Sequence, residues 1–402
     1  MPVKNFIEEY LRVTDDLESP TSYLKWGALS CISAVLRNNV YFRFPNRMET
    51  VYPNLYILLL GITAAVRKSN PMNITRDLVK NTNNTKVMAG AATMQGVLKE
   101  LGSTETGKPH GGSGIMIAKE LDAFFVKDPN TVSVLTDLFD YHPEYKKILI
   151  SYEMPPIKEV CLSLFAGSNE VMMRNLFDQR AIEGGLLGRF FVVKEDKKRK
   201  SNSGFEDDAK MIDDSEWDEA RTFLKILSTV KGPMIFTEEA RRFYNDWYHS
   251  LDDKNYDTKT GFEHRIQTHA IKLATVLSAS KAGFNRTIEM FEIQEAINEC
   301  GKLMQTYKKL TLGTGKSIVA DTMALVVRSL LECPNYHMTH KDLMISLFGE
   351  TDVDDIKKAI DTLVQTDFVE EASMNMVPGY RCTKKLLDKM LENKKAKSQS
   401  IQ

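Results

Sequence analysis

The sequence has few cysteines, no excess of charge of either sign and no long apolar run. Its five cysteines among 402 residues form no CxxC pair, which argues against a disulfide framework and a structural zinc site. The 53 basic and 54 acidic residues nearly cancel, so any affinity for nucleic acid must come from local patches. No stretch reaches the roughly 18 apolar residues of a membrane span, and the amino terminus lacks the pattern of a secretion signal. We therefore expect a cytoplasmic protein without a membrane partner.

The length suits two or three domains. Several apolar runs between residues 49 and 195 alternate with helical or glycine-rich segments, which is typical of an α/β fold with a mainly parallel sheet. A charge run follows, then long helical patterns and a tail rich in lysine. We expect an N-terminal helical segment, an α/β core, a charged linker, a helical lid subdomain, a winged helix-turn-helix and a disordered tail, at residues 1–48, 49–195, 196–216, 217–312, 318–392 and 393–402.

The stretch NLYILLLGITAAVRKSNP, residues 54–71, predicts a loop that binds phosphate. Such a loop needs a buried strand, a turn of exposed backbone N–H groups, a lysine for the phosphates, and a hydroxyl for Mg²⁺ at a helix start. Gly61 ends the strand, Lys68 is the lysine and Ser69 is the hydroxyl. The loop is one residue longer than GxxxxGKS/T, and Arg67 replaces its second glycine. The backbone groups that we expect to surround the nucleotide are those of Gly61, Ala65, Val66, Arg67, Lys68, Ser69 and Asn70.

A closer match by letter, LTLGTGKSIV, stands near residue 315. The segment before it has the pattern of an amphipathic helix, and a leucine occupies the place of the first glycine. We therefore interpret it as a turn between the helical subdomain and the carboxy-terminal domain.

Two polar residues follow later apolar runs and are candidates for catalysis. Glu120 comes after the run IMIA and could polarise the attacking water, while Asn169 ends the run EVCLSLFAGS and could orient it. Lys119 stands where a first acid is usual, so Glu120 and Asp122 are the carboxylates that could join Ser69 on Mg²⁺. The alternatives are that Glu120 caps the next helix and that Asn169 forms an ordinary turn.

Arg189 comes just before the last apolar run, RFFVVK, where ring-forming ATPases place an arginine that reaches the nucleotide of the adjacent subunit. Its competitors are Arg174 and Arg180, and the alternative is a surface ion pair. Arg265 could be a nucleotide sensor on the lid. We expect His264 and His269 to be packing or surface residues instead of metal ligands.

The chain resembles the P-loop ATPases of phages and mobile elements that are found fused to, or beside, primases. The likeness lies in YPNLYILLLG with its RKS, AATMQGVLKEL, GIMIAKEL, GGLLGRFFVV, HRIQTHAIKLATVL and FEIQEAI, over residues 19–310. The segment LLGRF is also similar to the LLSRF motif of the minichromosome-maintenance helicases. The resemblance implies a RecA/AAA+-like P-loop NTPase core and ATP hydrolysis in an oligomeric ring.

From this resemblance we expect a DNA-dependent ATPase with ATP and Mg²⁺ as cofactors, most simply a hexameric helicase of a phage or mobile element in the bacterial cytoplasm. Its partners would be single-stranded or forked DNA and a primase or another replisome protein. The alternative is a non-catalytic DNA-binding or replication-loading protein with a degenerate nucleotide site. The winged helix could bind DNA or protein, because its recognition helix VDDIKKAIDTLVQTD holds four aspartates against two lysines.

Overall fold

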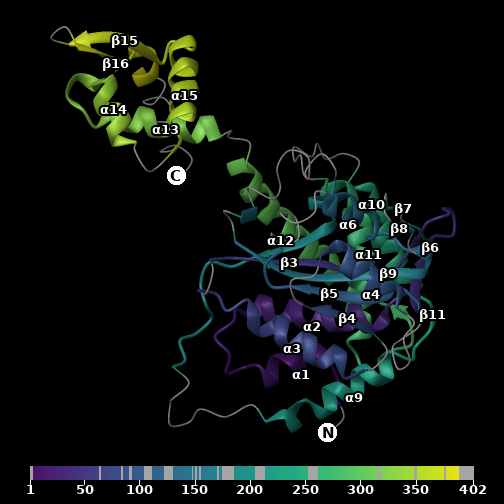
Figure 1. Cartoon of the computed structure of the whole chain (residues 1–402). Coiled ribbons are helices and arrows are strands. Elements are labelled where there is room, and N and C mark those ends of the chain that lie inside the picture. The colour runs from purple at the N-terminus through teal and green to yellow at the C-terminus, as the bar shows by residue number, and fades with distance from the viewer. Residues whose placement is uncertain are drawn as a thin grey trace. The chain divides into compact units, whose positions relative to one another are not determined.

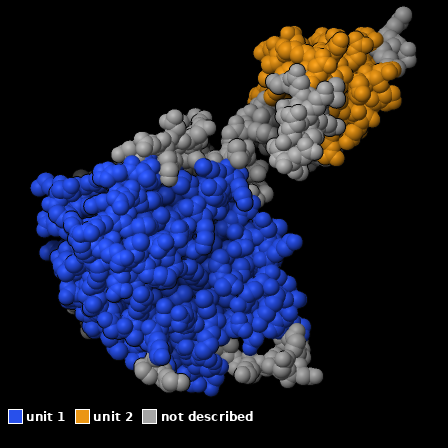
Figure 2. All heavy atoms as spheres, turned by 180° about the vertical axis from the view of Figure 1, so that it is seen from behind, with its two compact units in different colours: residues 1–311 blue, residues 312–402 orange. Residues whose placement is uncertain are grey.

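The computed structural model of the chain divides into two compact units, residues 1–311 and 312–402 (Figure 2). Each has its own hydrophobic core. The structure describes residues 3–62, 65–82, 85–89, 93–103, 111–121, 130–146, 148–149, 152–153, 155–169, 172–173, 185–203, 213–251, 261–314, 318–347, 351–374 and 377–388. The finer division of residues 1–311 that the sequence suggests stays a prediction.

A parallel sheet lies at the centre of unit 1 (Figure 1). Its strands run in the order β10-β3-β9-β5-β4, and every pair along this path is parallel. All five residues of β3 and all six of β5 are buried, as expected of a parallel sheet covered on both faces. The bounds are β3 (Tyr56–Leu60), β4 (Lys86–Ala89), β5 (Ser113–Ala118), β9 (Ile157–Ser168) and β10 (Phe190–Lys194). The expected α/β fold with a parallel sheet is therefore confirmed.

Three features of this region differ from the sequence-based expectation. The segment KVMA forms a strand, β4, although four residues are too few to show the alternation of apolar and polar residues that indicates a strand. The run METVYPNLYILLL contains two strands, β2 (Thr50–Val51) and β3, and Pro53 lies between them, where it has no N–H to donate to a ladder. Strand β6 (His142–Tyr145) pairs with β9 in the antiparallel sense.

Helices α1 (Phe6–Val13), α2 (Thr21–Leu36) and α3 (Ser69–Lys80) lie on one side of the sheet (Figure 1). Helix α2 is buried along almost its whole length. The hydroxyl of Tyr10 donates to the carbonyl of Pro71 at 3.3 Å, and the hydroxyl of Thr75 donates to the carbonyl of Gly27 at 3.2 Å. These bonds join α1 and α2 to α3, the helix that follows the candidate loop.

The helical part of unit 1 continues the same core. Its elements are η2 (Asp214–Trp217), α9 (Asp218–Leu227), α10 (Glu238–His249), η3 (Glu263–Arg265), α11 (Ile266–Ala279) and α12 (Met290–Thr314). The buried residues of these helices belong to the same hydrophobic cluster as those of the sheet. Short strands interrupt them: β11 (Gly232–Pro233) pairs with β1 (Val40–Arg43), and β12 (Ile235–Phe236) pairs with β13 (Thr287–Ile288).

The remaining elements of unit 1 are short. They are α4 (Met94–Gly102), α6 (Thr131–Asp137), β7 (Ile148–Leu149), β8 (Tyr152–Glu153) and η1 (Leu187–Arg189). Across both units, none of the helices in the described ranges has the length and apolar content that crossing a bilayer requires.

Within its described residues, unit 2 combines helices with a three-stranded antiparallel sheet of order β14-β16-β15. Its elements are α13 (Ile318–Leu331), η4 (Pro334–Tyr336), β14 (His337–Thr339), α14 (His340–Ser346), α15 (Val353–Gln365), β15 (Val369–Met374) and β16 (Val377–Cys382). Strand β14, three residues long, is missing from the sequence-based expectation. The interpretation of this order as a winged helix stays a prediction.

Candidate functional site

The order of the strands reverses at β3. The chain leaves β3 for the far edge strand β4, returns through β5 and β9, and reaches β10 on the other side of β3 only afterwards. Leu60, at the end of β3, is level with Ser168 of β9 and Lys194 of β10. Ligands of open α/β sheets bind outside the carboxyl ends of the strands where the order reverses. The loop that follows Gly61 begins at this place.

Gly61 is the residue where the chain turns away from the sheet. A β-carbon there would lie 2.5 Å from the carbonyl oxygen of Glu195 and 2.7 Å from the hydroxyl of Tyr23. That hydroxyl donates to the carbonyl of Leu60 at 2.6 Å, so it is fixed in place. Only glycine fits at this turn without moving its neighbours. Of the loop that follows, residues 63 and 64 lie outside the described ranges.

Arg67 occupies the position where the phosphate-loop pattern has its second glycine. Its φ is +49°, in the left-handed region that glycine adopts freely and other residues adopt at a cost. The arginine therefore takes a glycine-like backbone conformation. Val66 before it is fully buried, whereas Ala65 is exposed.

Lys68 and Ser69 lie where a phosphate loop needs them. Lys68 is the residue before α3, and its ammonium donates a hydrogen bond to the carbonyl of Gly61. Burial lowers the pKa of Lys68, and the charge of Glu120 opposes this shift. Ser69 is the exposed first residue of α3, and the first turn of the helix contains no acidic residue. The positive end of the helix dipole is therefore available to an anion.

Glu120 lies at the same edge of the sheet, two residues after β5. The next residue, Leu121, donates its N–H to the carbonyl of Gly167 in β9 at 3.0 Å, and a β-carbon on Gly167 would lie 2.7 Å from the carbonyl oxygen of Lys119. This close approach holds the acidic end of β5 against the end of β9. Glu120 itself is exposed.

Glu120 does not follow a strand adjacent to the one that leads into the loop. Strand β9 lies between β3 and β5, because the pairing order of parallel strands is set by long crossovers that leave no local pattern. Asn169, directly after β9, is therefore the closer of the two strand ends to the loop. Asp122 lies outside the described ranges.

Asn169 also has a structural task. Its side-chain oxygen accepts from the N–H of Met172 at 2.8 Å, and its carbonyl accepts from Met173 at 2.9 Å. It thus begins the next helical turn, as the turn alternative requires. Its role in orienting water stays a prediction.

Arg189 lies at the opposite end of the sheet. Phe190 is paired with Tyr56 at the start of β3, and Lys194 with Leu60 at its end, so about 20 Å of strand separates Arg189 from the level of Gly61. One guanidinium nitrogen donates to the carbonyl of Gly185 at 3.0 Å, and another lies 3.8 Å from the carboxylate of Asp140. Burial and the charge of Arg265 lower the pKa of Arg189.

Arg265 lies beside Arg189 instead of beside the loop of its own chain. Both guanidinium groups lie within 3.5 Å of the place that a β-carbon on Gly185 would occupy. The competitors of Arg189, Arg174 and Arg180, lie outside the described ranges. The guanidinium groups of Arg189 and Arg265 lie side by side, and such a pair of charged donors suits an anion.

The turn that carries Arg189 is held by two buried side chains. His269 of α11 hydrogen bonds the carbonyl of Gly188 at 2.8 Å, and Tyr307 of α12 donates to the carbonyls of Leu187 and Phe190 at 2.7 Å. Burial lowers the pKa of His269 to about 3, so its ring is neutral and donates from Nε2. His264 is exposed.

The oxygen donors near the loop decide which divalent cation could bind there. Ser69 and Glu120 supply a hydroxyl and a carboxylate, the oxygen donors that Mg²⁺ prefers together with phosphate and water. Within the described ranges, no group of three His, Cys, Asp or Glu side chains is arranged to hold a metal. The donor set therefore fits an ion that arrives with a nucleotide better than one held by protein alone.

Sequence reasoning missed the contribution of the amino-terminal segment. Glu18 and Ser19 contact Arg67, while Tyr23 and Glu195 close over Gly61. These residues are tens of positions or more away in the chain from the loop residues that they contact. No local motif could have identified them, because polar residues in a turn before a helix are common in any sequence.

No family model matches the chain, and no curated protein matches it. Among solved structures, the apo C-terminal region of NrS-1 gives a TM-score of 0.34 at 11% identity over 95% of this chain and 76% of that one. The Drosophila ORC bound to AT-rich DNA and Cdc6 gives 0.24 at 10% identity over 97% and 93%, and Cdc6p from Pyrobaculum aerophilum gives 0.24 at 12% over 94% and 95%. At these scores the likeness carries no weight, and the function is argued from the site alone.

Proposed function

We propose that the protein is a P-loop ATPase that acts on DNA. The observation that supports this most directly is the position of Lys68. Its ammonium bonds the carbonyl of Gly61 at the start of α3, and the charge of Glu120 acts on it. A lysine, a helix amino terminus and a carboxylate thus meet at one edge of a parallel sheet, as phosphoryl transfer to water requires.

In this function each group has a defined task. The N–H groups of the loop and the first turn of α3 bind the phosphates of ATP, and Lys68 leaves the carbonyl of Gly61 to bind the terminal phosphates. Ser69 and Glu120 would hold Mg²⁺, together with Asp122. When bound, Mg²⁺ neutralises the charge that develops on the phosphates. Glu120 polarises the attacking water and Asn169 orients it.

Arg189 acts on the nucleotide of an adjacent copy in a ring, for which we favour a hexamer. Its place at the end of the sheet away from Lys68 supports action between copies, because the side chain cannot span the length of β3. Arg265 contributes to the same contact, since it lies beside Arg189. If Arg265 contacts a nucleotide, it would therefore contact that of the adjacent copy and would not sense the nucleotide bound to its own chain.

The helicase role and the DNA contact of unit 2 are further parts of the proposal. In α15 the side chains of Lys357 and Lys358 lie 3.8 Å and 3.6 Å from Asp354 and Asp355. These ion pairs weaken any contact of the helix with phosphate. Unit 2 is therefore proposed to bind DNA through other residues, or to bind a replisome protein such as a primase. Salt-dependent binding of a single-stranded oligonucleotide, with and without residues 318–402, distinguishes the two.

The proposal is tested by ATP hydrolysis with and without single-stranded and forked DNA, in the wild type and in Lys68→Ala. We expect hydrolysis that DNA stimulates and that the variant loses. A second candidate function is a non-catalytic loading or DNA-binding protein, favoured by Asn169, whose side chain caps a helical turn. ATP binding by calorimetry without turnover would support that candidate and refute the motor.

A further inference from the structure

The backbone conformation of Arg67 needs support that a glycine would not need. Its positive φ of 49° brings the β-carbon close to the backbone. Such a conformation persists in a residue with a side chain only where the surroundings hold it. Two residues that bind Arg67 come from the turn between α1 and α2, far earlier in the chain.

Glu18 and Ser19 bind Arg67 at two points. A carboxylate oxygen of Glu18 accepts from Nε of Arg67 at 2.7 Å, and the hydroxyl of Ser19 donates to the carbonyl of Arg67 at 2.9 Å. The Glu18 side chain is 10% exposed, and that of Arg67 is 51% exposed. The backbone and the guanidinium of Arg67 are therefore both bound from the same side.

Glu18 is itself held by the segment that follows β10. The N–H of Asn202 donates to its carboxylate at 3.1 Å, the ammonium of Lys198 donates to the same oxygen, and the N–H of Arg199 donates to its carbonyl at 2.9 Å. We call residues 198–202 the strap. This part of the expected solvated linker is bound to the protein, and it fixes the Glu18 carboxylate before any ligand enters.

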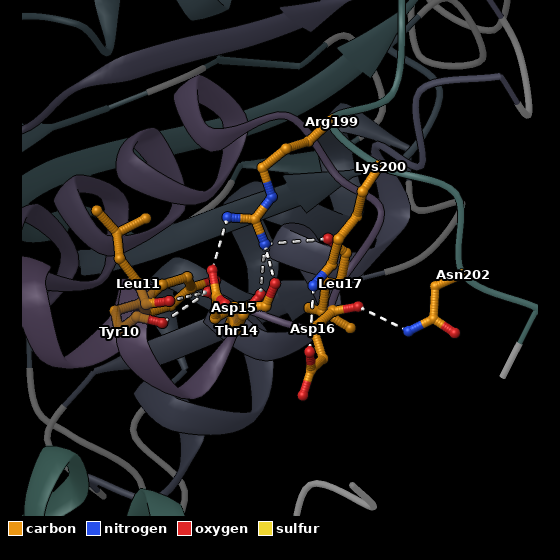
Figure 3. A network of polar contacts seen from close by, with 9 residues as sticks. All are labelled: Tyr10, Leu11, Thr14, Asp15, Asp16, Leu17, Arg199, Lys200 and Asn202. Atoms are coloured by element: carbon orange, nitrogen blue, oxygen red, sulfur yellow. Dashed lines mark hydrogen bonds and ion pairs between the residues drawn. The ribbon is translucent and has the colours of Figure 1, made fainter. Parts of the chain in front are cut away.

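The strap is attached along its length to the turn before Glu18 (Figure 3). The guanidinium of Arg199 donates to the carbonyls of Thr14 and Leu17 at 3.2 Å and 3.1 Å, and it also contacts the carboxylate and carbonyl of Asp15. Lys200 bonds the carboxylate of Asp16 at 3.1 Å. A turn held at this many points can serve as a rigid support for the loop.

We propose that Glu18 is the positioning residue of the phosphate loop, and that the Glu18–Arg67 pair replaces the glycine that precedes the lysine in the usual pattern. Glu18 fixes Arg67 in the left-handed conformation. Because Lys68 and Ser69 follow directly, that conformation sets where their side chains and N–H groups point. The inference rests on the proposed function for its consequence in nucleotide binding, but the support of the loop by Glu18 can be tested without a nucleotide.

If Glu18 acts through Arg67, the effect of Glu18→Gln should depend on which residue stands at position 67. A purely structural role of Glu18 would not give this dependence. With Arg67 present, Glu18→Gln removes the charged partner and the loop loosens. With Arg67→Gly, residue 67 adopts its φ without help, and Glu18→Gln should then leave the loop unchanged. Both variants are compared alone and together, and each is first checked for an unchanged cooperative thermal transition.

The first readout is hydrogen exchange of the unliganded full-length protein. The amides of Ala65 and Asn70, which bond the carbonyls of Ile62 and Arg67 at 3.3 Å, report on the loop. We expect Glu18→Gln to speed their exchange at least fivefold in the Arg67 protein and less than twofold in the Arg67→Gly protein. Equal effects in both proteins, or no effect in either, would overturn the proposal.

The second readout is the affinity for a non-hydrolysable ATP analogue with Mg²⁺, measured by calorimetry. We expect Glu18→Gln to weaken binding about tenfold in the Arg67 protein and less than twofold in the Arg67→Gly protein. Asp16→Asn is the matched control, because Asp16 contacts the strap through Lys200 and makes no hydrogen bond or ion pair with the described residues of the loop; it should change neither readout. If the wild type does not bind the analogue, the proposed function fails while the exchange experiment still decides the role of Glu18.

A third variant covers the case in which Glu18→Gln does not fold. Arg67→Lys keeps the β-carbon and the positive charge and removes the Nε donor. It should loosen the loop more than Arg67→Gly does. The opposite order would show that Glu18 does not act through Arg67.

Discussion

The ammonium of Lys68 donates a hydrogen bond to the carbonyl of Gly61, the residue at which the chain leaves β3. The lysine thus lies over the turn that it closes, half-buried, at the edge of the sheet where β5 and β9 also end. Lys68 can therefore exchange its hydrogen bond with the carbonyl of Gly61 for a bond with a phosphate. The predictions below follow from this geometry and from the opposite end of the same sheet.

We expect Lys68→Ala to lower the rate of DNA-stimulated ATP hydrolysis by about a hundredfold or more, because an oriented cation next to the transferred phosphate is lost. The measurement is steady-state phosphate release at saturating ATP. Lys80→Ala, at the exposed carboxyl end of the same helix, is the control and should keep the wild-type rate. Hydrolysis by Lys68→Ala at the wild-type rate would refute the assignment of the loop.

Gly61→Ala should destabilise the fold by about 1–3 kcal/mol, the usual cost of forcing an extra carbon into a packed site. The new carbon would lie 2.5 Å from the carbonyl of Glu195. Gly301→Ala is the control, since Gly301 lies inside α12 and a β-carbon there would meet no atom within 4 Å; it should stabilise by about 0.5–1 kcal/mol. Denaturant unfolding of the two variants measures both changes, and similar values would contradict the close packing at Gly61.

Mixing experiments can show whether Arg189 acts between copies. Arg189→Ala alone should lower the rate of hydrolysis by about 10³-fold or more if it is the arginine of the neighbour. A mixture of Arg189→Ala with Lys68→Ala should recover activity, because some contacts then join an intact Lys68 to an intact Arg189. Arg221→Ala, which breaks ion pairs with Asp214 and Asp218, is the control and should hydrolyse ATP at the wild-type rate without mixing. A mixture as inactive as its components would place the role of Arg189 within one chain.

The contribution of Lys272 to the stability of the protein should rise with pH above about 8. This side chain is buried, donates to the carbonyl of Tyr52 and to Asn54, and lies 4.4 Å from the ring centre of Phe139. Burial lowers the pKa of Lys272 to about 8 from 10.5. Between these values the Lys272 site binds more protons in the unfolded chain than in the folded one, so its contribution to the free energy of unfolding increases by up to about 1.4 kcal/mol per pH unit.

The measurement for Lys272 is urea unfolding of the wild type and of two variants between pH 7.5 and 9.5. The contribution of Lys272 opposes the effect of the buried thiols of Cys31, Cys161 and Cys300, whose pKa is raised by burial, because the unfolded chain loses their protons first. The free energy of unfolding of the wild type should rise over this range relative to that of Lys272→Met, whereas its difference from Lys225→Met, at an exposed position of α9, should stay constant. An identical pH dependence in Lys272→Met and the wild type would show that the ammonium is not desolvated.

Local sequence was enough to predict the strand, turn and helix around Lys68. The apolar run identifies a buried strand, and the glycine after it marks where that strand ends. The lysine followed by a hydroxyl marks the start of α3. The same reasoning identified the apolar runs of β5, β9 and β10. It missed β4 and β14, which have four and three residues, because such short strands show no periodicity of their own.

The sequence by itself determined which residues form the candidate loop, since those residues are neighbours in the chain. Only the tertiary structure decided that β9 separates β3 from β5, that Arg265 lies beside Arg189, and that Glu18 supports Arg67. Each of these relationships joins segments that are tens of residues apart. They depend on how strands pair and how turns pack, which is decided by burial over the whole unit and leaves no periodic signal in any one segment.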